Sequence, residues 1–144
     1  MQESYLLTGH SHRQYLQSQY GKTILNPGSV GIPQGGNRWP SYALLRVEDG
    51  AVTFQLRQVP YDIIAAIHTQ FENGLVEYSH CWGISILYDI ITAEEYTIRL
   101  LENVCKNGDV YDEEVWHREA AKMGMKFTER EIIELLSRQE VLND

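Results

Sequence analysis

Two histidines near the start of the chain, His10 and His12, have the residue type and spacing best suited to chemistry. They belong to the sequence GHSH at residues 9–12, which directly follows a short apolar run at residues 5–7. Imidazole is the commonest protein ligand for metals, and a strand that ends in this sequence presents both rings from a tight loop. Residues two apart on an extended backbone point to opposite sides, so His10 and His12 would reach two adjacent metal ions more easily than one. The alternative is a pair of turn histidines without a ligand role.

A second polar segment, residues 26–31 with the sequence NPGSVG, follows closely. Asn and Gly tolerate left-handed backbone angles, Pro27 fixes one torsion, and the Ser29 hydroxyl can bond locally. These properties are typical of a structural turn. Asn26 and Ser29 are nevertheless candidates for contact with a substrate. Arg13, directly after the histidine loop, is a further candidate unless it is an ordinary surface arginine.

Strands and turns are the elements expected to position these residues. Short apolar runs at residues 4–8 and 23–25 predict two strands that end at the two polar segments. Residues 42–48 and 51–59 flank Asp49-Gly50, the strongest short-range hairpin signal. The second of these segments alternates apolar and polar residues, which predicts a sheet with one face in water.

Beyond residue 62 the apolar period changes to that of helices, and we expect three to four of them after the strands. The fold class is therefore α+β or α/β. Thr92 with Glu95 and Thr128 with Glu131 have the spacing of capping boxes. The stretch 75–91 is apolar and aromatic without a clean period and stays ambiguous. The helices expected cover residues 63–72, 92–107 and 112–123, with a last one after Thr128.

Length and composition predict a single domain over residues 1–144, with strands in 1–62 and a helical extension in 63–144. The chain has 12 basic and 20 acidic residues and a formal charge of −8. Such a charge disfavours a surface that neutralises phosphates, so nucleic acid is not the expected partner.

The cysteines, histidines and aromatic residues outside the first segment are interpreted as packing residues. Cys81 and Cys105 lack CxxC spacing, and the sequence contains no run of 18 apolar residues and no charged-then-apolar leader. We therefore expect a cytoplasmic protein without a membrane segment. Core or surface packing is expected for His68, His80 and His117, and an aromatic core or interface for Tyr78, Trp82 and Tyr88.

The GHSH motif and the NPGSVG turn, in this order and at this spacing, resemble the C-terminal half of a calcineurin-like metallophosphoesterase of the small bacterial and archaeal phosphodiesterase branch. The resemblance covers about residues 6–62 and includes the strand at 41–45 and the hairpin turn at 48–50. It implies a partial metallophosphoesterase sandwich of sheets. It also implies a hydrolase for phosphoester bonds that uses two divalent ions, which in this family are Mn, Zn, Fe or Mg.

The resemblance implies that His10 and His12 are metal ligands of the family's last motif, one expected for each ion, while Arg13, Asn26 and Ser29 stay candidates for contact with the substrate. The other ligand motifs are an Asp-x-His, a Gly-Asp pair, a Gly-Asn-His and an isolated His, and they precede the GHSH motif. This sequence has only eight residues there, so we expect those ligands upstream of Met1. Two imidazoles cannot hold two hard divalent ions. The isolated chain is therefore expected to bind metal weakly, if at all, and to hydrolyse little.

A chain with mainly the second sheet of such a sandwich leaves an apolar face and an open strand edge. We therefore expect a homo-oligomer or a complex with a separately encoded N-terminal half, with a phosphoester as substrate once the site is complete. The alternative is a non-catalytic oligomeric interaction module derived from the same family. A helical regulator that binds nucleic acid is disfavoured because the tail is acidic.

Overall fold

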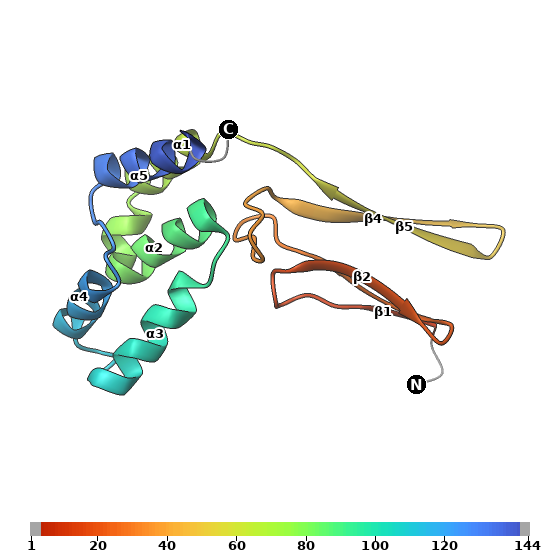
Figure 1. Ribbon diagram of the computed structural model, residues 1–144, viewed down its shortest axis with the longest axis horizontal. Helices are drawn as coiled ribbons and strands as arrows, with labels where there is room; N and C mark the ends of the chain where they lie inside the picture. The colour runs from red at the N-terminus through yellow and green to blue at the C-terminus, as the bar shows by residue number, and fades with distance from the viewer. Residues whose placement is uncertain (1–3, 142–144) are drawn as a thin grey trace. The chain divides into compact units, whose positions relative to one another are not determined.

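The computed structural model describes residues 4–141 of the chain. Contacts divide the chain into two compact units, one formed by residues 1–61 with 92–94 and the other by residues 62–91 with 95–144 (Figure 1). The boundary after Tyr61 falls where the sequence changes from a strand period to a helix period. The single domain expected over residues 1–144 stays a prediction.

The first unit contains two small β-sheets (Figure 1). In the three-stranded sheet the central strand β3 (Lys22–Pro27) is parallel to β1 (Tyr5–Leu7) and antiparallel to β2 (Gln14–Gln19). The other sheet is the hairpin of β4 (Ser41–Glu48) and β5 (Ala51–Gln58). The rings of Tyr5 and Phe54 join the two sheets, with centroids 5.5 Å apart.

The hairpin lies within one residue of the range expected from the sequence. Its turn residues Asp49 and Gly50 both have positive φ, 49° and 79°, as a two-residue turn that matches strand twist requires. The register pairs Leu45 with Phe54 and Val47 with Val52, so most apolar residues of the two strands share one face, whereas Tyr42 and Leu44 lie on the other. The alternation in the sequence therefore corresponds to a real two-faced ribbon.

The strands of the first unit bury little apolar surface. Leu25 is the only buried apolar side chain in the five strands. Leu7, Leu45 and Val47 are 58%, 48% and 61% exposed. Within the described residues β1 is also an edge strand, paired with β3 on one side only. The apolar face and open edge expected from the sequence are both present in this unit.

Within the described residues the second unit is built from five helices, where three to four were expected. They are α1 (Ile63–Glu72), α2 (Leu75–Thr92), α3 (Tyr96–Asn107), α4 (Glu113–Lys122) and α5 (Glu129–Val141) (Figure 1). The helix not assigned from the sequence is α2, which occupies the ambiguous stretch. Together the helices enclose a core with fully buried side chains, among them Ile67, Leu87, Leu100, Ile132 and Leu136. No helix within residues 4–141 is long and apolar enough to span a bilayer.

The first residues of the helices show which side chains cap them. Asp62 and Asp112 cap α1 and α4 by accepting hydrogen bonds from the backbone N–H groups of Ala65 and Glu114. The capping box expected at Thr92 is wrong, because Thr92 is the last residue of α2 and α3 begins only at Tyr96. The first turn of α3 is capped instead by the buried Asp89 of α2, whose carboxylate accepts from the Thr97 N–H at 3.1 Å.

Candidate functional site

The GHSH segment forms a tight loop directly after β1. The Ser11 N–H donates to the Gly9 carbonyl at 2.8 Å, which closes a γ-turn around His10. His10 and His12 have φ values of 70° and 56°, so both adopt left-handed backbone angles that cost a residue with a Cβ about 1–3 kcal/mol each. His10 is exposed and His12 half-buried. The loop therefore holds both imidazoles on a strained backbone at the surface of the first unit.

Asn26, the residue that links the two motifs, holds this loop in place. Its side-chain amide donates to the Gly9 carbonyl and to the Ser11 hydroxyl, each at 3.0 Å. Its side-chain oxygen accepts from the Gly28 N–H at 3.0 Å. The residue is only 1% exposed. The geometry thus gives Asn26 a positioning role for the histidine loop, while the substrate contact expected from the sequence stays a prediction.

Hydrogen bonds to β4 hold the NPGSVG turn in place. The Ser41 hydroxyl accepts from the Ser29 N–H at 3.1 Å, and the Ser41 N–H donates to the Ser29 carbonyl at 2.9 Å. Gly28 has φ of 87°, and a Cβ there would lie 2.0 Å from the Ser41 hydroxyl oxygen. Ser29 uses its hydroxyl to accept from the Ile32 N–H at 3.0 Å. The turn is therefore a packed structural element that requires glycine at position 28.

Two further residues lie beside the histidine loop. Arg13 is exposed and forms an isolated parallel bridge with Gln34, whose N–H donates to the His12 carbonyl at 3.2 Å. The amide nitrogen of Gln14 lies within 3.0–3.2 Å of three carbonyl oxygens, those of Pro27, Tyr42 and Arg57. Gln14 thereby ties the end of β3 to the hairpin. Nothing in the sequence pattern singled it out, because a glutamine in an exposed strand looks like any surface residue.

The described part of the chain does not by itself offer the donor set of a two-metal centre. Residues 4–141 contain no group of three or more His, Cys, Asp or Glu side chains that could hold a metal ion. The GHSH loop contributes two imidazoles, those of His10 and His12. A catalytic zinc site uses three protein ligands, and Mn²⁺ or Mg²⁺ takes several oxygens. Further ligands must therefore come from outside these residues if a divalent ion is to be held tightly.

Comparisons with known proteins agree with the motifs. Residues 1–50 match the family model of the calcineurin-like phosphoesterase superfamily domain. A "probable metallophosphoesterase" of Mycoplasma pneumoniae is 32% identical over 57 residues, which cover 40% of this chain and 36% of the relative. The chain therefore spans little more than a third of that protein. No solved structure matched the chain.

Both matches support a relation between this chain and calcineurin-like phosphoesterases, and the family match lies in the first unit. Members of that superfamily generally use divalent metal ions. The family match ends inside the hairpin, at residue 50, so it does not extend to the helical unit.

Proposed function

We propose that the first unit is the C-terminal portion of a metal-dependent phosphodiesterase or phosphatase, in which His10 and His12 bind divalent metal. The observation that carries this proposal is the loop geometry. A buried asparagine from the NPGSVG turn orders the GHSH loop, and the strained backbone leaves both histidines at the surface. Strain of this kind persists where the surroundings enforce it and is common at functional sites.

The proposed reaction is hydrolysis of a phosphoester by two metal ions, which would activate water and offset charge on the phosphate. The residues of this chain supply only part of that site. Arg13, Asn26 and Ser29 are the proposed substrate-side residues, with Asn26 acting mainly by positioning the loop. The remaining ligands would come from a segment with the Asp-x-His, Gly-Asp and Gly-Asn-His motifs, either continuous with this chain or encoded separately.

The thin core of the first unit supports a partner on the strands. A unit of this size with one buried apolar strand residue gains little stability from apolar burial. Exposed apolar faces of this kind usually mark an interface. The proposed partner is the complementary half of the phosphoesterase sandwich. A second copy of the chain would cover the same surface in the alternative function, a non-catalytic oligomeric module.

Metal binding is tested on the isolated chain by NMR of the histidine ring protons during titration with Co²⁺. The signals of His10 and His12 should broaden first and at high metal concentration, because two ligands bind weakly. His10→Ala should remove the effect on His12, whereas His68→Ala, in the helical unit, should leave it unchanged. Earlier broadening at His68, His80 or His117 would contradict the ligand assignment.

Activity is tested with bis(4-nitrophenyl) phosphate and Mn²⁺. The isolated chain should show no rate above buffer. A complex with a polypeptide that carries the missing motifs should hydrolyse the substrate, and His10→Ala should abolish that rate. A stable complex without hydrolysis would favour the interaction module instead.

A further inference from the structure

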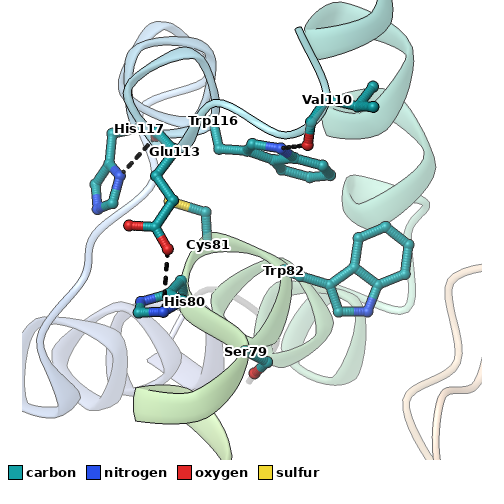
Figure 2. A pocket seen from close by; sticks show the side chains of 8 residues that line it. All are labelled: Ser79, His80, Cys81, Trp82, Val110, Glu113, Trp116 and His117. Carbon is teal, nitrogen blue, oxygen red and sulfur yellow. Dashed lines mark hydrogen bonds and ion pairs between the residues drawn. The ribbon is translucent and has the colours of Figure 1, made fainter.

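The helical unit contains a cavity of about 310 Å³ that the proposed phosphoesterase chemistry does not use. Residues 79–82 of α2 form one side of it, and Val110, Glu113, Trp116 and His117 form the other (Figure 2). The cavity is at the small end of the range for ligand sites. It therefore suits a small ligand rather than a cofactor.

Two indole rings meet at nearly a right angle in this cavity. The ring centroids of Trp82 and Trp116 are 5.9 Å apart, with an interplanar angle of 74°. The Trp116 Nε1–H donates to the Val110 carbonyl at 2.9 Å, which fixes the orientation of that ring. Aromatic faces carry partial negative charge and attract cations, and tryptophan does so most strongly. The arrangement is thus a preformed corner for a positively charged group.

The charges around the cavity have the matching sign. Glu113 is its only acidic lining residue, and no lysine or arginine lines it. The Glu113 carboxylate lies 3.1 Å from His80 Nε2, and both side chains are more than half exposed, so an entering cation can reach the carboxylate. The whole helical unit contains sixteen acidic and seven basic residues, against four and five in the first unit. The electrostatic potential of the helical unit therefore attracts cations.

The cavity's chemistry points to an organic cation. The described residues include no group of three or more His, Cys, Asp or Glu side chains that could hold a metal ion. Cys81 is buried, and burial together with the Glu113 carboxylate raises the pKa of its thiol to about 11. The thiol is therefore neutral at physiological pH, which makes it part of an apolar surface and not a nucleophile.

We propose that this pocket binds a small organic ammonium ion, with its alkyl groups against Trp82 and Trp116 and its charge balanced by Glu113. Each cation–π contact is modest, so the expected dissociation constant is roughly millimolar. The proposal is independent of the phosphoesterase function, because all of its residues lie in the helical unit.

The test uses the full chain with Trp39→Phe, so that tryptophan fluorescence reports only Trp82 and Trp116, the other two of the three tryptophans. Choline is titrated against 3,3-dimethyl-1-butanol, which has the same shape without the charge. Choline should change the fluorescence in a saturable way, and the alcohol should bind about tenfold more weakly or not at all. Equal binding of both compounds, or no binding of either, overturns the proposal.

Variants then locate the site. Glu113→Gln should weaken choline binding about tenfold, because a carboxylate partner is lost. Glu114→Gln, its neighbour outside the cavity, should leave binding unchanged. Circular dichroism checks that each variant is folded. If Glu113→Gln does not fold, the comparison of choline with the alcohol on the Trp39→Phe chain still decides whether the pocket binds the cation. Equal effects of the two Glu variants would also refute the proposal, since they would indicate attraction by net charge alone.

Discussion

At the scale of single residues, Asn26 connects two motifs that are separated in the sequence by residues 13–25. Both protons of its amide and its oxygen are engaged by the backbone or hydroxyl groups of residues 9, 11 and 28. A buried group whose partners are all satisfied is costly to replace, because each partner then stays unpaired in the interior. The histidine loop therefore depends on a residue outside it.

Asn26→Asp is expected to destabilise the first unit by about 2–3 kcal/mol, because two donors are lost and a carboxylate would face the Gly9 carbonyl. Urea unfolding measures the change. Asn37→Asp is the matched control, since Asn37 is exposed and its amide bonds to the exposed Gln58. The NMR signals of His10 and His12 should shift in the Asn26 variant alone. Equal stabilities of the two variants would show that Asn26 does not hold the loop.

Gln14 and Ser41 illustrate which site residues sequence reasoning misses. The GHSH and NPGSVG motifs were visible because their residue types are unusual together, and the structure joins them through Asn26. Gln14 and Ser41 act through backbone carbonyls and N–H groups that only tertiary structure brings near them. Their residue types are common on surfaces, so no local pattern distinguishes them.

At the scale of elements, α3 and α4 are joined by a buried carboxylate. Glu119 is 2% exposed and accepts from Lys122 Nζ at 2.8 Å, from Arg118 Nε at 3.2 Å and from the Asn107 amide at 3.2 Å. The hydrogen bond from Lys122, followed by that from Arg118, lowers the pKa of Glu119 below its ordinary value of 4.5. The ionised form is thus the one that the fold stabilises.

The pH dependence follows from that direction. A lowered pKa in the folded state means that the stabilisation is complete above pH 4.5 and is lost as the pH falls through the folded-state pKa. Glu119→Gln should therefore lower the melting temperature at pH 7, and the difference from the parent should shrink below pH 4.5. Glu102→Gln, which removes only an exposed pair with Lys106, serves as the control and should have little effect at either pH. A difference that stays constant down to pH 3 would contradict the assignment.

The elements that the sequence revealed are those with a regular period and a local start signal. The hairpin, α1, α4 and α5 have both, and the Thr128 hydroxyl does contact the Glu131 N–H at 3.4 Å and its carboxylate at 2.6 Å. In α2 the backbone leaves helical geometry at His80, with φ 49° and ψ −132°, and nearly every residue from 83 to 91 is buried. A kinked helix whose second half is buried on nearly all sides shows no continuous amphipathic stripe.

The exposed strand β2 was not predicted from the sequence. Its sequence, QYLQSQ, has no apolar face that would mark it as a strand.

At the scale of the whole molecule, the two units differ in how they gain stability. Most of the buried apolar side chains belong to the helices, whereas the strands keep large apolar side chains in contact with water. The same division separates the charges, since the helical unit carries the excess of acidic residues. Burial of apolar area drives both folding and association, so the two units are expected to behave differently in isolation.

Light scattering should detect association of the full chain at micromolar concentration, because the strands expose an apolar face and an edge. A fragment of residues 62–144 should unfold cooperatively when followed by circular dichroism, because it contains most of the buried apolar side chains. It should be monomeric by light scattering, because it carries the excess of acidic residues. Leu45→Lys and Val47→Lys, which replace two exposed apolar side chains of the hairpin, should reduce association of the full chain. A monomeric full chain would contradict the interface on the strands.

The unpaired side of β1 has a further consequence for the life of the protein in a cell. Its three residues, Tyr5, Leu6 and Leu7, carry no charge and no proline, so of the usual devices against addition of a strand from another molecule β1 has its short length but neither of these two. Under the proposed function, newly made chains would need prompt capture by the partner proposed to cover this strand, and an excess of the polypeptide over that partner would be removed by proteases or accumulate as insoluble material.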